Sequence, residues 1–389
     1  MKKSSRLCVL VVAFAICFAE LCLFSGCSNP TKQDTTLSGN IMYLSIVYTA
    51  LDPSATDRSQ ARTTYFYIYD ISKKELKKMY SITAPSSYPV GVVDYKNSKV
   101  YYSIWGDLKN TADKAGDKLQ CYDLKTHKTT DITSMHHSFN QITLFANQIF
   151  AISAGLESNG SRQLTRINPI THEFTPISPD NTDIEYRDYS IDYSTGEILT
   201  LSYSDFSDRH APESKDNSGI IKAPPIFLSV TNTRLDTPKV IYTFSQRPYY
   251  SPYGYNWDKD PETKKLAEKT ANNLDVAAPS RMDSNNILFL GAPDVFSNDI
   301  KLKVLHLDTK TVDDFPIKGV KYYSRPLVSP NKKGMFISLK MENGEGGMYY
   351  YTFANKKLEY LFSINDVKKD LLTQTASSLV TTEIQLIVE

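Results

Sequence analysis

The sequence lacks the short motifs of the common enzyme chemistries. It contains no Gly-x-Ser-x-Gly elbow, no His-Glu-x-x-His pair, no glycine-rich phosphate loop and no paired-cysteine metal knuckle. It also lacks an excess of one charge, because 44 Lys and Arg residues stand against 43 Asp and Glu residues. The net charge of +1 gives no electrostatic reason to expect nucleic acid as a partner. The sequence therefore names no reaction, no cofactor and no metal.

Helical periodicity is also scarce, and short β-type runs take its place. The segments after residue 40 are rich in Tyr, Val, Ile and Phe, with turn residues between them. The 26 tyrosines favour strands over helices. With 389 residues, 41% of them hydrophobic, the chain is long enough to bury a large all-β core.

The N-terminal segment is of a different kind. A basic start precedes an apolar stretch over residues 7–24, and two small residues stand just before Cys27. This segment resembles the lipobox signal of bacterial lipoproteins, although Phe24 replaces the usual aliphatic residue and Glu20 interrupts the stretch. The alternative is an uncleaved membrane anchor, but spanning needs about 20 apolar residues and a central acid costs about 2.5–3.5 kcal/mol.

The lipobox resemblance has three implications for the chain. Residues 1–26 would be a signal peptide, Cys27 would carry a fatty acyl chain such as palmitate, and residues 27–39 would be a polar tether. The protein would be lipid-anchored on the extracytoplasmic face of an inner or an outer membrane. Of five cysteines, only Cys27 and Cys121 would remain, so no intrachain disulfide is available and the fold must rest on its hydrophobic core.

An internal repeat organises residues 40–389. One half-unit is a strand, a tight turn and a second strand, and an Asp or Asn side chain sets up the turn by bonding the backbone two residues on. Six copies begin at Phe66, Leu119, Leu164, Leu228, Leu302 and Tyr349. Five complementary half-units begin at Val92, Ile142, Tyr189, Arg281 and Pro326. Each pair of half-units predicts one four-stranded antiparallel sheet, like a blade of a β-propeller.

The sixth inner half-unit is divided between the two ends of the chain. Its strands are expected at residues 41–48 and 379–388, and their pairing would close a ring and remove two exposed sheet edges. The run Ser329–Phe336 is similar to the Ser-Pro-Asp-Gly-Lys hairpin of TolB-like and WD40-like propellers, although Asn331 replaces Asp and the glycine comes later. Repeat and resemblance together predict an all-β, six-bladed β-propeller. Seven blades, a β-sandwich array and two β-domains are the alternatives.

Two insertions interrupt the repeat. The first, at about residues 205–225, is polar and is predicted to be a surface loop. The second, at about residues 245–279, carries five aromatic residues that can stack on sugars or anchor a protein. These predicted ligand-binding or partner-binding residues are Tyr249, Tyr250, Tyr253, Tyr255 and Trp257. The alternative is that their rings pack the insertion onto the propeller.

Histidines and the remaining cysteine are weaker candidates for chemistry. His136 and His137 fall between two blades and His210 lies in the first insertion, but adjacency in sequence does not show that metal ligands converge. Exposed loop histidines are the simpler interpretation, and no metal site is predicted. Cys121 lies in an alternating apolar run, which favours a buried strand thiol over a nucleophile.

Recognition is the function that this architecture favours. A propeller offers a rigid ring with faces built from loops, and the fold alone does not decide among partners. We expect a monomeric, membrane-anchored scaffold that binds an envelope protein, a peptide or a glycan. The alternatives are a lyase, lactonase or other hydrolase with polar residues converging in the axial channel, and a structural role in docking a membrane complex.

Overall fold

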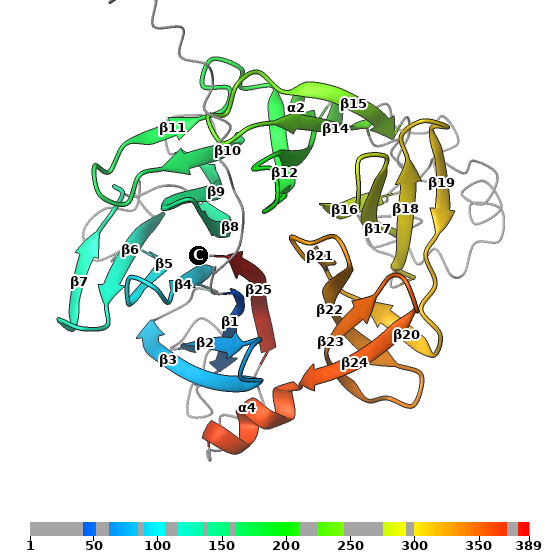
Figure 1. Cartoon of the computed structure of the whole chain (residues 1–389). Helices are drawn as coiled ribbons and strands as arrows, with labels where there is room; N and C mark the ends of the chain where they lie inside the picture. Colours follow the sequence, from blue (N-terminus) through cyan, green and yellow to red (C-terminus); the bar gives the residue numbers. More distant parts are fainter. Residues whose placement is uncertain are drawn as a thin grey trace, which may run out of the picture. The chain divides into compact units, whose positions relative to one another are not determined.

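The computed structural model describes most of the repeat region. The described residues are 42–51, 62–84, 89–105, 116–134, 138–155, 161–209, 224–244, 275–292, 299–371 and 380–388. The chain divides into two units, Met1–Gly39 and Asn40–Glu389, and every described residue belongs to the second. The described strands form six antiparallel sheets arranged around one axis (Figure 1). The predicted six-bladed propeller is confirmed, and the seven-bladed and sandwich alternatives are wrong.

The second to fifth blades are meanders whose first strand lies nearest the axis, and in the first blade the last strand of the chain takes this place (Figure 1). From the axis outward, the first blade contains β25 (Val380–Val388), β1 (Met42–Leu51), β2 (Arg62–Asp70) and β3 (Glu75–Ala84). The second contains β4 (Gly91–Asp94), β5 (Lys99–Trp105), β6 (Asp117–Asp123) and β7 (Lys128–Asp131). The third contains β8 (Ser138–Phe145), β9 (Gln148–Ala154), β10 (Arg162–Ile167) and β11 (Phe174–Pro176).

The other three blades follow in chain order. The fourth contains β12 (Ile184–Ile191), β13 (Ile198–Ser204), β14 (Ile226–Thr231) and β15 (Lys239–Phe244). The fifth contains β16 (Asp275–Arg281), β17 (Asn286–Ala292), β18 (Lys301–His306) and β19 (Thr311–Asp314). The sixth contains β20 (Val320–Tyr323), β21 (Leu327–Val328), β22 (Gly334–Met341), β23 (Gly346–Thr352) and β24 (Lys357–Phe362), and both β20 and β21 pair with β22.

Side chains of Asp and Asn set up the turns between outer strands. Asp70 Oδ1 accepts hydrogen bonds from the backbone N–H groups two and three residues later, at 3.0 and 3.1 Å. Asp123 and Asn168 make the same pair of bonds, at 2.7–3.1 Å. Four residues after Asp70, Lys74 has a φ of 56°, a left-handed conformation that returns the chain to the next strand. The predicted role of these Asp and Asn side chains is confirmed.

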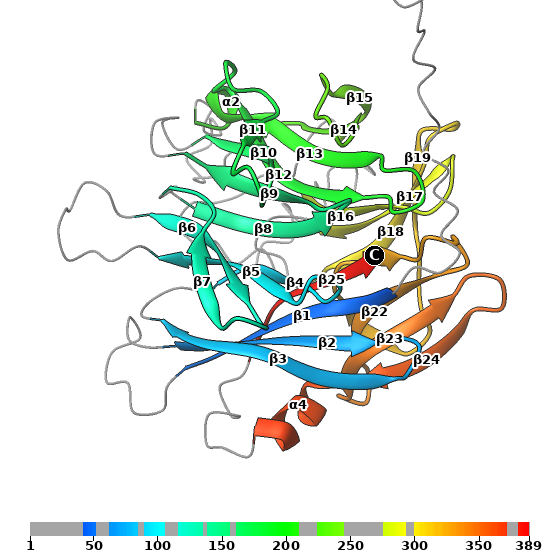
Figure 2. The ribbon, with the colours of Figure 1, turned by 60° about the vertical axis from the view of Figure 1, so that its left-hand side comes forward.

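Apolar side chains fill the spaces between neighbouring blades. Strands β9 and β13 are buried over nearly their whole length, because each has a sheet neighbour on both sides and a blade against each face, whereas β7 is exposed throughout. Phe66, Tyr80 and Tyr102 pack ring against ring between the first two blades, with centroids 5.7–6.0 Å apart. Figure 2 shows the first three blades as successive layers.

The two ends of the chain meet in the first blade. Strand β25 pairs antiparallel with β1, from Met42 opposite Val388 to Thr49 opposite Val380. Leu386 and Ile387 are 2% and 0% exposed there. The prediction that a divided blade closes the ring is confirmed.

The structure differs from the expected insertion boundaries at two places. The expected second insertion reaches residue 279, but β16 begins at Asp275 and pairs with β17. The sequence is misleading because Pro279 lacks an N–H donor, and the strand accommodates it in a bulge between Ala277 and Ser280. The first insertion, expected to be a loop, begins as the short helix α2 (Asp205–Arg209).

The described helices are short. The longer of them, α4 (Ile364–Leu371), follows the sixth blade, and its Val367 is fully buried against the first and sixth blades. Within the described part of the chain, no helix has the length and apolar character needed to cross a membrane.

Candidate axial binding site

A cavity of about 420 Å³ lies at the axis of the ring. It is lined by residues of the innermost strands of five blades, β8, β12, β16, β21 and β25, and of the loop between β20 and β21. Hydroxyl and amide side chains make up most of its polar lining. Its acidic and basic side chains are Arg187, Asp188, Arg325 and Glu383. This volume lies in the range of sites for small ligands.

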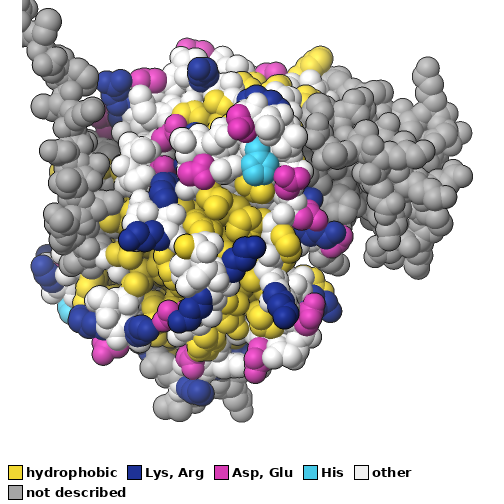
Figure 3. All heavy atoms as spheres, turned by 45° about the vertical axis from the view of Figure 1, so that its right-hand side comes forward, with side chains coloured by type: hydrophobic (Ala, Val, Ile, Leu, Met, Phe, Trp, Pro, Cys, Tyr) yellow, Lys and Arg dark blue, Asp and Glu magenta, His cyan; other side chains and the backbone are white. Residues whose placement is uncertain are grey.

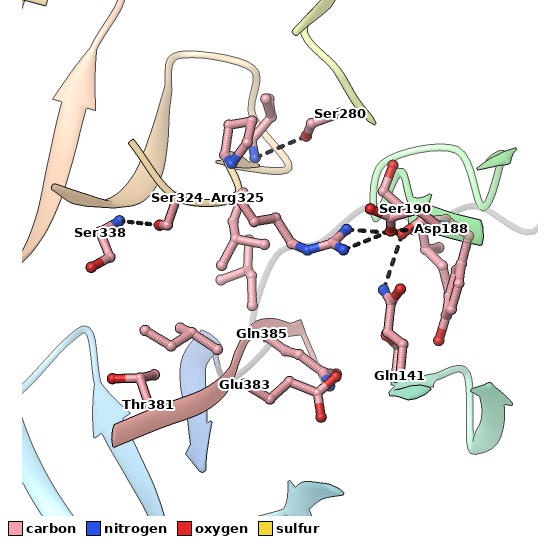
Figure 4. Close-up of a pocket in the computed structure, with 18 of the residues that line it drawn as sticks. Gln141, Asp188, Ser190, Ser280, Ser324, Arg325, Ser338, Thr381, Glu383 and Gln385 are labelled. Atoms are coloured by element: carbon pink, nitrogen blue, oxygen red, sulfur yellow. Dashed lines mark hydrogen bonds and ion pairs between the residues drawn. The ribbon is translucent and has the colours of Figure 1, made fainter. Parts of the chain in front are cut away.

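Arg325 lies in a break of the innermost strand of the sixth blade. The break falls between β20 and β21, where Pro326 has no N–H with which to continue the strand ladder. Its guanidinium group donates from Nη2 to Asp188 Oδ1 at 2.6 Å and from Nη1 to the carbonyl oxygen of Tyr189 at 3.1 Å (Figure 4). Burial alone would lower the pKa of Arg325, but the Asp188 carboxylate more than offsets this and holds it above the ordinary value.

Asp188 connects three blades. Its side chain on β12 accepts the bond from Arg325 of the sixth blade, and its Oδ2 accepts the backbone N–H of Ala278 on β16 at 2.7 Å. The backbone N–H of Tyr189 is a third donor, 2.7 Å from Oδ1. On the opposite side, Gln141 of β8 donates from Nε2 to the carbonyl oxygen of Tyr189 at 3.0 Å. These bonds make one network across four blades, which fixes the wall of the cavity.

A second ion pair beside the cavity joins the fourth and fifth blades. Arg187 of β12 donates from both terminal nitrogens to the two carboxylate oxygens of Asp275 on β16, with a distance of 2.7 Å for Nη2 to Oδ2. Burial opposes the charge of Arg187, but Asp275 offsets it, so the pKa of Arg187 is also raised. Both arginines of the cavity wall are therefore held by carboxylates.

Glu383 is the fourth charged group, and backbone donors hold it. Its carboxyl group on β25 accepts the N–H of Gly91 at 3.0 Å and the N–H of Ile142 at 3.3 Å, which lie on β4 and β8. Burial raises the pKa of Glu383 to about 8, although these two N–H groups, a hydrogen bond from the Gln385 amide and the Arg325 charge act in the opposite direction. Among the described residues, no Lys, Arg or His forms an ion pair with it. Near neutral pH, this carboxyl group is therefore mostly protonated.

Gln385 follows Glu383 on the same face of β25 and is only 6% exposed. Its Nε2 donates to the carbonyl oxygen of Ile142, and this bond fixes the orientation of the amide. Its Oε1 is buried and has no hydrogen-bond partner in the described part of the chain. Because buried acceptors usually have a donor, this oxygen can accept a hydrogen bond from a water molecule or a ligand.

The structure offers no metal centre among the residues that it describes, because no three His, Cys, Asp or Glu side chains converge there. Cys121 lies on β6 and is 7% exposed, and burial raises the pKa of its thiol to about 11. A thiol with so high a pKa is a poor nucleophile at neutral pH. The prediction of a buried strand thiol is confirmed.

The residues that sequence reasoning selected for binding all fall outside the described part of the chain. These are Cys27, Tyr249, Tyr250, Tyr253, Tyr255 and Trp257, together with His136, His137 and His210. The axial residues were not predicted by sequence reasoning, although one signal was present. The last strand carries Glu383 and Gln385 between apolar neighbours, and polar side chains on the innermost strand of a blade face either a neighbouring blade or the axis.

On the face shown in Figure 3, the described residues form no patch of a single charge that would compete with the axial cavity as a binding site. Cationic and anionic side chains are interspersed there around hydrophobic ones (Figure 3). Such a mixed surface lacks the basic patch that a nucleic acid would require.

The chain has similar solved structures but no match among family models or curated proteins. The chain is similar to TolB from Acinetobacter baumannii, with 13% identity and a TM-score of 0.45 over 82% of this chain and 63% of the TolB chain. It is also similar to nidogen from a nidogen/laminin complex, with 9% identity and a TM-score of 0.46 over 89% of this chain and 98% of nidogen.

A prolyl endopeptidase is a third similar structure, with 11% identity and a TM-score of 0.44 over 81% of this chain. The chain spans only 42% of the length of that protein and 63% of the length of TolB. At these identities, no residue role passes from these proteins to this chain.

Proposed function

We propose that this protein is a recognition scaffold, anchored to a membrane by an acyl chain on Cys27, that binds an envelope protein, a peptide or a glycan. The axial cavity is its main binding site. One observation carries this proposal: the ionisable side chains around the cavity are already bonded across the blades. Asp188 and Arg325 hold each other at 2.6 Å, and Glu383 is bonded to two backbone N–H groups.

Such an arrangement favours binding because it is rigid before the ligand arrives. A preformed cavity loses little conformational entropy when a ligand binds. The hydroxyl and amide groups of its wall can then select a ligand by the hydrogen bonds that they form with it. Ser190 and Ser280 are among these groups, and both line the cavity. The aromatic residues Tyr249–Trp257 are proposed as a second contact, which would extend recognition to a larger partner.

Filling the cavity tests the proposal. Ser190 lines the cavity and is half-buried, so Ser190→Phe places a ring in the space that a ligand would occupy. Ser207→Phe is the matched control, because Ser207 is exposed on α2 and lies outside the cavity. Both variants and the parent protein are applied to arrays of envelope peptides and glycans. We expect Ser190→Phe to lose the binding that Ser207→Phe keeps, and equal binding by the two variants would rule out the cavity as the site.

The aromatic contact is tested separately. Changing Tyr250, Tyr253 and Trp257 to Ala removes most of the proposed stacking surface. We expect weaker recovery of the partner in crosslinking from membranes, with an unchanged thermal unfolding curve. A loss of folding without a selective loss of binding would mean that these rings pack the insertion instead.

The alternative function is that of an enzyme, a lyase, lactonase or other hydrolase, and one observation favours it. Glu383 has a pKa of about 8 because it is buried, and it lines the cavity, as a general acid or base would. Activity toward lactones or uronate glycans that disappears in Glu383→Gln would support the enzyme. Ligand binding without turnover would support the scaffold.

A further inference from the structure

Glu383 is the acidic or basic residue of the axial cavity that lacks an oppositely charged partner among the described residues. Arg187 pairs with Asp275 and Arg325 pairs with Asp188, so each of these pairs is neutral as a whole. An ionised Glu383 would therefore give the cavity one net negative charge. A ligand with a single positive charge complements such a cavity, whereas a carboxylate or phosphate ligand would meet repulsion from Glu383.

Gln385 adds an independent observation. Its Nε2 donates to the carbonyl oxygen of Ile142, and the amide also bonds the Glu383 carboxyl group, whereas its buried Oε1 has no donor among the described residues. Glu383 and Gln385 lie two residues apart on β25, and Figure 4 shows both side chains extending to the same side of the strand. An ammonium group offers three donors and no acceptor, which is the complement of a carboxylate beside an amide oxygen.

The site is accessible from one end of the strand. Thr381 also lines the cavity and is exposed, Glu383 is partly buried, and Gln385 is 6% exposed. A ligand can therefore approach past Thr381 and place its charged end between the other two residues.

We propose that the axial cavity binds a small ligand through a protonated primary amine, which donates hydrogen bonds to the Glu383 carboxylate and to the side-chain oxygen of Gln385. This inference rests on the proposed function, since it names the chemistry of the ligand for that same cavity. A lysine-like ligand and an amino sugar both carry such an amine. The experiment below tests the two kinds of ligand separately.

Binding should depend on pH in a definite direction. The pKa of free Glu383 is about 8, so at pH 6 its carboxyl group carries a proton that must leave before the ammonium group can pair with it. The other groups that face Glu383 are Arg325 from the β20–β21 loop, which lowers its pKa, and Tyr189 of β12, whose own pKa burial raises well above the ordinary value. Backbone N–H groups face it from β4 and β8. None of these partners titrates between pH 6 and pH 8, so Glu383 is the one of these protein groups that sets the pH dependence.

Calorimetric titration of the full chain is the test. The first probe is Nα-acetyl-lysine methylamide, with Nα-acetyl-norleucine methylamide as its neutral analogue. The second is glucosamine, with N-acetylglucosamine as its neutral analogue. We expect one amine to bind at least about tenfold more tightly than its analogue. The affinity of the lysine probe should rise about tenfold from pH 6 to pH 7 and level off above pH 8, whereas that of glucosamine should rise and then fall above about pH 8, where its own amine loses its proton. Equal binding of an amine and its analogue, or no binding of either amine, would overturn the inference.

Three variants assign the contacts. Glu383→Gln keeps the size of the side chain and should weaken amine binding at least about tenfold and remove its pH dependence. Gln385→Met removes the acceptor together with the Nε2 donor to Ile142, so its urea unfolding is compared with that of the parent. If it folds, it should weaken binding about threefold to tenfold while the pH dependence stays. Thr130→Val is the control, because Thr130 is exposed on the outer strand β7 and lies outside the cavity, so this variant should bind as the parent does.

The outcomes separate this inference from the function on which it rests. The comparison of amine and neutral analogue on the parent protein holds even if Glu383→Gln fails to fold. Amine binding that does not change between pH 6 and pH 8 would remove Glu383 from the site. If amines fail but Ser190→Phe abolishes binding to the peptide or glycan array, the recognition function stands and only the amine chemistry is wrong.

Discussion

The bonds of Asp188 should dominate the stability of the ring. Its carboxylate is 6% exposed and accepts three donors from three blades, at 2.6–2.7 Å. Asp188→Ala would leave two backbone N–H groups and the guanidinium group of Arg325 without this acceptor. Removal of one partner from a buried pair costs about 3–5 kcal/mol. We therefore expect Asp188→Ala to lower the free energy of unfolding by about 3–5 kcal/mol.

Urea unfolding, followed by circular dichroism, measures this loss, and a double-mutant cycle apportions it. Arg325→Met alone removes the cation, and the double variant removes both charges. The free energy of unfolding that the double variant loses should be smaller than the sum of the two single losses. We expect the difference to be about 0.5–3 kcal/mol, because the double variant leaves no unpaired buried charge. Lys74→Ala, in the exposed pair of Lys74 with Glu359 at 2.7 Å, is the control and should not shift the midpoint measurably. If Asp188→Ala behaves like this control, the network does not hold the blades together.

Three further predictions concern other parts of the chain. Ile387→Ala should destabilise the protein by about 2–5 kcal/mol in urea, because Ile387 is fully buried in β25, whereas Thr381→Ala on the same strand should be neutral. The hydrogen bonds from Ser72 and Lys73 lower the pKa of Asp70 to about 2. The Asp70 carboxylate therefore contributes fully to the free energy of unfolding above about pH 4, and this contribution is lost as the pH falls toward 2. The stability advantage over Asp70→Asn should accordingly shrink between pH 5 and pH 2.5, and an advantage independent of pH would contradict this reasoning. Cys27→Ser should abolish radioactive palmitate labelling and leave unprocessed precursor, and persistent labelling would refute the lipid anchor.

The fold could be predicted from the sequence because its blades are local. Each outer hairpin carries its own turn, as Asp70 shows by bonding the backbone only two and three residues on. The repeat of such local units predicts the strands of each blade. The single strands that remain at the two ends of the repeat predict that they pair and close the ring. The boundary at residue 279 was wrong because Pro279 imitates a loop within a bulged strand.

The axial site could not be predicted because its contacts are long-range. Glu383 meets Gly91 and Ile142, which are 292 and 241 residues away in sequence, and Arg325 meets Asp188 across 137 residues. No spacing rule connects such residues. The repeat identifies the innermost strands, but bulges and the break at Pro326 decide which of their side chains face the axis.

The pairing of β25 with β1 has a consequence for the order in which the protein is made. Strand β1 is made before all the other described strands, but its partner β25 is made after all of them. Until then, the first blade has a bare edge that can template wrong pairings. Residues Thr381–Leu386 also form one wall of the axial cavity. A chain without β25 would therefore keep five blades intact but leave the ring open and the axial cavity without this wall.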